Sequence, residues 1–247
     1  MDTAVGLVQA YLHLNGYLVL TEVPVQLRAG AGYYTETDLD ILAVRFPQRE
    51  ERYADPSSEW EAFFRGEDPA LDLRNDSMDF IVGEVKEGRS HANPALRRRA
   101  TIHFALRRIG CCDEATIPNV VAEIAQRGEA RVPVPGGGAC RIRLVIFGGH
   151  GEWHDEGLTE IPLRHVTLFL QDRLRQHRDV LQGIEFRDAT LGMLRLMDKL
   201  GLELDVARQP VAEARSPGEE PPPGQEPPLA RTNRQRRWTR MRRNPRR

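Results

Sequence analysis

Residues 78–86, MDFIVGEVK, have the composition of a buried β-strand. Their apolar side chains are mostly β-branched or aromatic, and turn-forming residues flank them. Because strand side chains alternate between two faces, Glu84 and Lys86 share the face that runs back through Val82 and Phe80. The pattern predicts a carboxylate beside an ammonium at the end of a buried stripe. An ordinary ion pair on an edge strand gives the same pattern, since Glu-x-Lys is common by chance.

Lys86 stands out because the chain has 33 arginines and only two lysines, Lys86 and Lys199. The lysine ammonium is a compact point charge, whereas the guanidinium group is wide, flat and always charged. The scarcity of lysine therefore indicates a role for Lys86 that arginine fills badly.

A second strand is predicted over residues 37–46, TDLDILAVRF, where Asp40 shares a face with Leu42 and Val44. Asp40 is then also placed where a buried stripe meets its polar end. This puts it in the same kind of position as Glu84 on its own strand.

The neighbouring segments complete an order of helix, three strands, helix and strand. A helix is expected from a cap at Asp2 or Thr3 to a stop at Asn15-Gly16. A strand follows over residues 17–27, with Glu22 on its Leu18 and Leu20 face. A basic helix over 94–109 and a strand over 140–148 come after Lys86.

This arrangement resembles the PD-(D/E)XK nuclease superfamily, and most of all its Holliday-junction-resolvase-like branch. The matching residues are Asp40 in Leu39–Ala43, and Glu84 and Lys86 in Gly83–Gly88. The resemblance covers about residues 3–149. It implies an α/β, restriction-endonuclease-like αβββαβ core, with a mixed sheet flanked by helices; periodicity over 156–204 adds two C-terminal helices.

The chain departs from the family pattern in two places. Many members carry an acidic residue on the first helix, and the body of the predicted helix here has none, although Glu22 would substitute from a strand. Asp40 and Glu84 are also 44 positions apart, because an insertion at about 47–77 separates their strands. Both departures are compatible with a divergent or inactive member.

The resemblance implies a metal-dependent nuclease that hydrolyses phosphodiester bonds in DNA. Asp40 and Glu84 would bind Mg²⁺ or Mn²⁺, with the Val85 carbonyl as a third ligand. Lys86 would lie beside the attacking water and offset the growing negative charge. Glu22 and Asp38 are possible accessory residues.

Two basic segments are candidates for nucleic-acid binding. The predicted helix after Lys86 carries Arg97, Arg98 and Arg108, with Arg97 and Arg108 expected on one face. A solvated face of an Arg-rich chain is the alternative. Residues 231–247 contain nine arginines and no acid, and Arg237, Trp238 and Arg240 would contact phosphates and stack on a base. The alternatives for this tail are an incidental extension and docking on the protein's own acidic body.

Composition defines the organisation of the 247-residue chain. We expect one nuclease-like domain over 1–207, a Pro/Glu-rich linker over 208–230 and the Arg-rich tail over 231–247. The chain shows no secretion signal and no apolar run of membrane-spanning length, so no membrane partner is expected. Its three cysteines, without C-x-x-C spacing, indicate buried thiols in a cytoplasmic protein. His150 and His154 are expected in a glycine-rich turn.

Three functions remain open from the sequence. The first is the nuclease. The second is a catalytically inactive module of the same fold that binds nucleic acid or protein. The third is an interaction protein whose acidic body and basic tail recruit partners. DNA versus RNA, and endonuclease versus exonuclease, are left open, as is the oligomeric state.

Overall fold

A computed structural model describes residues 2–47, 62–87, 93–134, 137–148, 157–181 and 185–202. The chain divides into a compact unit, Met1–Leu204, and a second unit, Asp205–Arg247, which lies outside the described residues. The expected linker and tail, with Arg237, Trp238 and Arg240, therefore remain predictions. The two histidines expected in a turn also lie outside the described residues.

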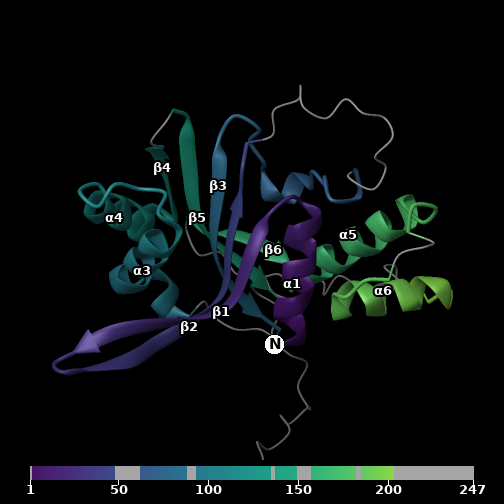
Figure 1. Cartoon of the computed structure of the whole chain (residues 1–247), viewed down its shortest axis with the longest axis horizontal. Helices are drawn as coiled ribbons and strands as arrows, with labels where there is room; N and C mark the ends of the chain where they lie inside the picture. The colour runs from purple at the N-terminus through teal and green to yellow at the C-terminus, as the bar shows by residue number, and fades with distance from the viewer. Residues whose placement is uncertain are drawn as a thin grey trace, which may run out of the picture. The chain divides into compact units, whose positions relative to one another are not determined.

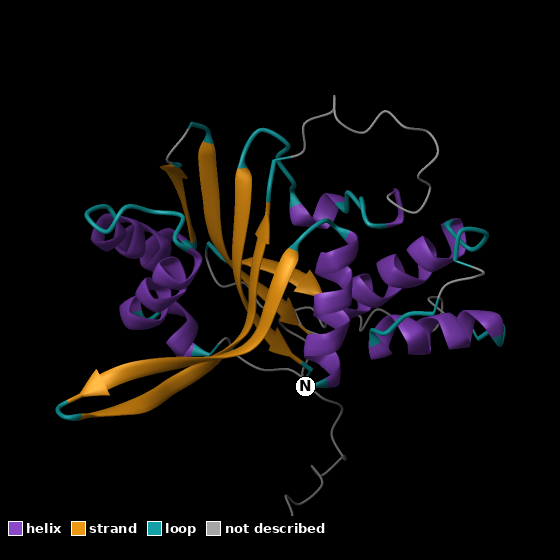
Figure 2. Cartoon of the chain, viewed as in Figure 1, coloured by secondary structure: helices purple, strands orange, loops and turns teal. Residues whose placement is uncertain are grey.

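The compact unit is built on a six-stranded mixed sheet (Figures 1 and 2). Its order is β1-β2-β3-β5-β4, with β6 also pairing with β5. The first three strands are antiparallel, β5 runs parallel to β3 and β6, and β4 is antiparallel to β5. The bounds are β1 (Leu18–Ala29), β2 (Gly32–Arg45), β3 (Met78–Lys86), β4 (Glu129–Pro133), β5 (Ala139–Gly148) and β6 (Thr159–Pro162).

Within the described residues, five α-helices cover the two faces of this sheet (Figure 2). Side chains of α1 (Thr3–Leu14), α5 (Leu163–Gln176) and α6 (Ala189–Lys199) pack on one face against Ile41, Ile81 and Phe147. Side chains of α3 (Arg99–Ile109) and α4 (Ile117–Arg127) pack on the other against Leu42, Val82 and Leu144. Two 3₁₀ turns, Pro69–Leu71 and Pro94–Arg97, connect these elements. The protein is thus an α/β protein with one mixed sheet between two helical layers.

Helix α1 forms where its sequence signals predict it. The Asp2 carboxylate caps it by accepting a hydrogen bond of 2.8 Å from the Ala4 amide. Val5, Val8 and Leu12 are buried against the sheet. Gly16, with φ of 80°, supplies the left-handed residue that ends the helix and turns the chain into β1. The N-terminus of α1 consequently lies near the ends of the central strands.

The β1–β2 hairpin changes direction at Glu22 and Asp40. The strand register pairs Thr21 with Ile41 and then Val23 with Leu39, and Glu22 has a left-handed φ of 51°. Leu39 and Leu42 pack in one core cluster while Ile41 packs in the other, so strict alternation is broken at Asp40. The regular alternation predicted over residues 37–46 is therefore interrupted at Asp40, between Leu39 and Ile41. Beyond this point the hairpin extends away from the sheet (Figure 1).

The other predicted elements are largely confirmed. The strand over 78–86 has the expected bounds, and the first helix, the strand ending at Gly148 and the two C-terminal helices are present. The predicted basic helix over 94–109 is wrong as a single helix, because Arg98 is extended, with φ of −67° and ψ of 133°, and separates a 3₁₀ turn from α3. Arg97 and Arg108 therefore do not share one helical face.

A buried charged network connects Tyr17, just after α1, to the sheet. The network lies at the start of β3, whereas Glu84 lies near the end of that strand. The Asp79 carboxylate accepts hydrogen bonds from the Tyr17 hydroxyl at 2.5 Å and from Arg143 Nη2 at 2.7 Å. All three residues are buried. Burial raises the pKa of Tyr17 well above its ordinary value, so the hydroxyl stays protonated and donates to Asp79. Because a buried charge needs a partner, loss of Asp79 would leave Arg143 uncompensated.

Candidate active site

Strand β3 places Glu84 and Lys86 as an ion pair. Lys86 Nζ lies 2.5 Å from Glu84 Oε1, and the Glu84 side chain is 4% exposed against 29% for Lys86. The strand alternation predicted from the sequence explains the contact, since residues i and i+2 are nearest neighbours on one face. Burial raises the pKa of Glu84, the Asp40 charge raises it further, and Lys86 opposes both.

Asp40 approaches the same part of β3 from the neighbouring strand. Its Oδ2 accepts a hydrogen bond of 2.8 Å from the Val85 amide. Burial raises the pKa of this half-buried carboxyl, whereas the Val85 hydrogen bond and the Lys86 charge lower it. Asp40, Glu84 and Lys86 therefore act on one another electrostatically, so the structure brings the three predicted residues into one neighbourhood.

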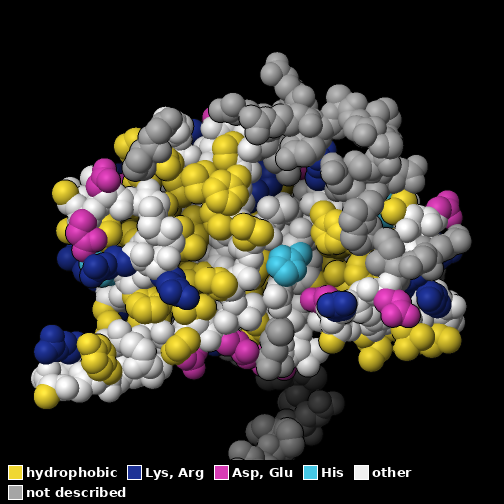
Figure 3. Space-filling model, viewed as in Figure 1, with side chains coloured by type: hydrophobic (Ala, Val, Ile, Leu, Met, Phe, Trp, Pro, Cys, Tyr) yellow, Lys and Arg dark blue, Asp and Glu magenta, His cyan; other side chains and the backbone are white. Residues whose placement is uncertain are grey.

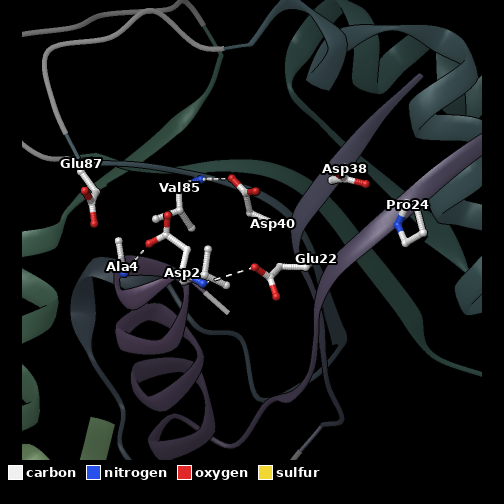
Figure 4. A pocket seen from close by; sticks show the side chains of 9 residues that line it. Asp2, Ala4, Glu22, Pro24, Asp38, Asp40, Val85 and Glu87 are labelled. Atoms are coloured by element: carbon white, nitrogen blue, oxygen red, sulfur yellow. Dashed lines mark hydrogen bonds between the residues drawn. The ribbon is translucent and has the colours of Figure 1, made fainter. Parts of the chain in front are cut away.

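An acidic pocket of about 330 Å³ opens beside Asp40 (Figure 4). Figure 4 shows Asp40 next to the Val85 amide and Asp2 joined to Glu22, whose Oε1 lies 3.3 Å from the Asp2 backbone nitrogen. Glu84 and Lys86 do not line the pocket, because they alternate with Val85 and Glu87 along the chain. Asp40 thus links the pocket to the Glu84–Lys86 pair. The described lining residues include five carboxylates and no basic residue: Asp2, Glu22, Asp38, Asp40 and Glu87.

The two accessory residues, Glu22 and Asp38, are therefore beside Asp40, whereas Asp2 and Glu87 were not singled out as site residues from the sequence. Asp2 was expected only as a helix cap. Because α1 begins beside the ends of the strands, this cap also places a carboxylate in the pocket. Glu87 directly follows Lys86 and had no distinguishing pattern. The signal for Asp2 was thus present in the capping motif, but its position over the sheet depends on tertiary packing.

The carboxylates fit a divalent cation in their chemistry. Mg²⁺ favours one or two carboxylates, with carbonyl and water oxygens completing its shell. Within the described residues, Asp40 Oδ1 and Glu84 Oε2 have no protein hydrogen-bond donor, and both carboxyls are held partly desolvated. The same part of the chain contains no group of three or more His, Cys, Asp or Glu side chains arranged to hold a metal. A site here would therefore use two carboxylates, the Val85 carbonyl and non-protein oxygens.

The three predicted phosphate-binding arginines occupy different environments. Arg97 is half-buried and its Nη1 donates to the Ala125 carbonyl of α4 at 3.2 Å. Arg98 forms an ion pair with Glu36 of the hairpin. Arg108 is exposed on the last turn of α3. They do not form one stripe. Arg97 has a structural role, because it links the 3₁₀ turn before α3 to α4.

Neutralising Glu84 should stabilise the metal-free protein at neutral pH. A raised carboxyl pKa means that the folded state binds the proton more tightly than the unfolded chain does. The protonated Glu84 therefore adds to the stability of the fold at low pH, and this contribution is lost as the pH rises through the raised pKa. We expect Glu84→Gln to raise Tm by a few degrees at about pH 7, with the difference shrinking below about pH 4.5, the carboxyl's ordinary value. Thermal unfolding at both pH values measures this, with Glu123→Gln, at a half-exposed carboxylate on α4, as control. A lower Tm for Glu84→Gln at neutral pH would contradict the desolvation argument.

Comparison with protein-family models, with curated proteins and with solved structures returns no match. Among the described helices, none has the length and apolar character needed to cross a membrane. The site's own residues are consequently what indicates a function.

Proposed function

We propose that this protein is a metal-dependent nuclease that hydrolyses phosphodiester bonds in DNA. The observation that carries the proposal is the convergence of Asp40 and the Glu84–Lys86 pair on one stretch of β3. Both carboxyls are partly desolvated, the Asp40 charge raises the pKa of Glu84, and the partly exposed Lys86 pairs with Glu84. Perturbed carboxyls beside a pocket are typical of functional sites.

Each residue has a distinct task in this proposal. Asp40 and Glu84 are the carboxylate ligands, and the Val85 hydrogen bond fixes the orientation of Asp40. Lys86, partly exposed beside Glu84, orients the attacking water or offsets negative charge that develops on the phosphate. Water attacks phosphorus, the P–O bond to the leaving nucleoside breaks, and a proton completes the leaving hydroxyl.

A bound Mg²⁺ or Mn²⁺ would supply Lewis-acid polarisation of the phosphate and a lowered pKa for its bound water. The acidity of the pocket supports this requirement. A polyanionic substrate would be repelled by the five lining carboxylates unless cations offset their charge. Three further carboxylates line the pocket and would orient water around such a cation: Asp2, Glu22 and Asp38.

The topology supports membership of the PD-(D/E)XK superfamily with a restriction-endonuclease-like core. A capped helix, an antiparallel three-stranded unit, a crossover made of α3, α4 and the short strand β4, and a strand parallel to β3 follow in that order. Asp40 and Glu84 lie on the two adjacent strands in which the family carries its acidic residues. Asp2 at the start of α1 offers a carboxylate near the place where many members use the first helix.

The alternative is a catalytically inactive module of the same fold. The absence of an acid within the body of α1 and the long insertion before β3 favour it. A cleavage assay with Mg²⁺ or Mn²⁺ separates the two, because the inactive module binds nucleic acid or protein without producing shorter strands.

Deleting residues 231–247 should weaken DNA binding without removing the chemistry. The segment holds nine arginines and none of the proposed ligands. Each phosphate neutralised on duplex DNA contributes roughly 0.9 to the log–log salt slope, so the truncated protein should show a shallower salt dependence. Turnover at saturating substrate should be retained, and the loss of affinity should be largest at low salt.

Binding titrations of both forms across a salt series measure this difference. Equal affinities and equal slopes would show that the tail is not a nucleic-acid arm. Docking of the tail on the protein's own acidic surface would then explain it better.

A further inference from the structure

The outer part of the β1–β2 hairpin, residues 23–39, forms an arm that leaves the sheet at Glu22 and Asp40 (Figure 1). Residues 28–35 at its end are all exposed. Tyr33 is 74% exposed and Tyr34 is 45% exposed. Large aromatic side chains left open on a protruding ribbon have no packing role there, and exposed apolar groups of this kind mark interaction sites.

The charge of the outer arm, residues 23–35, differs from that of the pocket beside its base. These residues contain one arginine, Arg28, and no acidic residue, whereas the two acids of the arm, Glu36 and Asp38, lie nearer to its base. Arg28 lies directly opposite Tyr33 in the hairpin register. On the face seen in Figure 3, blue and yellow side chains occupy the outer arm. The outer arm is therefore the part of the site's surroundings that suits a polyanion.

The base of the arm is anchored while its end is open. Val25 and Leu39 are buried in the core cluster under α3 and α4. Glu36 pairs with Arg98, and Asn93 Nδ2 lies 3.2 Å from Thr37 Oγ1. These contacts fix the direction of the ribbon relative to α3. A ligand held by the end is thus held at a set distance from Asp40.

We infer that the arm lies in the major groove of a DNA duplex and that Tyr33 and Tyr34 contact it about six base pairs from the phosphate at Asp40, an inference that rests on the proposed nuclease function. Tyr34 precedes Asp40 by six residues of the same strand, which is about 20 Å at roughly 3.3 Å per residue. Successive base pairs are about 3.4 Å apart, so the same length spans about six of them.

The shape and chemistry of the arm both fit this partner. The major groove of B-DNA admits a two-stranded β-ribbon. Tyrosine rings offer apolar contact to base edges and thymine methyl groups, and Arg28, opposite Tyr33, supplies a phosphate contact at the same level. One strand, β2, would then carry both the recognition end and the Asp40 ligand.

The test uses the full chain with Tyr33→Ala/Tyr34→Ala, measured by fluorescence anisotropy without added metal. A duplex of about 16 base pairs reaches the arm's end from the site, whereas a hairpin with a stem of about four base pairs is too short to do so. We expect about tenfold weaker binding of the longer duplex and little change for the short hairpin. Tyr33→Phe/Tyr34→Phe keeps the rings and should retain most of the affinity. Leu196→Ala/Leu200→Ala, similarly exposed on α6, is the matched control and should bind as the parent.

The outcomes separate this inference from the nuclease proposal. Parent-like binding of the longer duplex by the alanine variant would overturn the arm contact, whether or not the parent cuts DNA. A changed oligomeric state in light scattering with unchanged DNA affinity would also overturn it and mark the arm as a protein surface. If binding of the longer duplex needs the two tyrosine rings but the parent cuts no DNA with Mg²⁺ or Mn²⁺, the arm contact is supported and the nuclease proposal is overturned. Absence of any DNA binding would overturn both.

Discussion

Replacing Glu84 by Gln, or Asp40 by Asn, should abolish DNA cleavage, with a loss of about 10²–10³-fold or more in rate. Each change keeps the size and shape of the side chain and removes the charge that would hold the cation. Glu84 is buried against β5 and Asp40 is held by the Val85 amide, so neutral amides fill the same space without a packing defect. Folding should therefore persist while chemistry is lost.

Cleavage rates at saturating Mg²⁺, with thermal unfolding on the same samples, measure this prediction. Glu123→Gln on α4 is the matched control, because it removes a half-exposed carboxylate that forms an ion pair with Arg127, far from the candidate site in the fold. Cleavage by both site variants at the parent rate would show that neither carboxylate serves as a ligand.

Lys86→Arg should be nearly as damaging, with about a 10²-fold loss of turnover, although it conserves the charge. The lysine ammonium reaches Glu84 Oε1 at 2.5 Å from a side chain that is only 29% exposed. A guanidinium group is wider and planar, and it would turn toward a two-point contact with Glu84 in place of a water or phosphate oxygen.

The chain provides its own control for this substitution, since Lys199 is the only other lysine. Lys199→Arg, at the end of α6, should cut as the parent does. If purified Lys86→Arg cut as fast as Lys199→Arg, the argument from lysine scarcity would be wrong.

Much of the fold could be predicted because its elements carry strong local signals. The β-branched run over 78–86 forms a strand with the predicted ends, and Asp2 caps α1 as its sequence indicates. The pairing of Glu84 with Lys86 follows directly from strand alternation. These features depend on residues that are neighbours in the sequence.

Features that depend on distant residues were missed. The break at Asp40 needs the left-handed Glu22 on a neighbouring strand, and alternation along one strand cannot reveal it. Arg143 looks like a surface residue in sequence, yet it is buried because Asp79, 64 positions away, neutralises it. The β4 strand and α4 helix were not singled out, and Arg98 interrupts a basic helix whose letters alone look continuous.

The site itself was predicted in its central residues and incompletely in its surroundings. Asp40, Glu84 and Lys86 come together as alternation and strand order suggested. The pocket's remaining acids depend on how α1 lies across the strand ends, which places Asp2 beside Glu22. No local pattern encodes that packing.

The central claim is tested most directly by incubating the purified chain with linear, nicked, branched and single-stranded DNA in the presence of Mg²⁺ or Mn²⁺. The proposal predicts metal-dependent strand cleavage of at least one substrate by the parent and by Lys199→Arg, abolished by chelation and by Glu84→Gln. Intact DNA in every lane at saturating protein and metal, or cleavage that Glu84→Gln performs equally well, would contradict it.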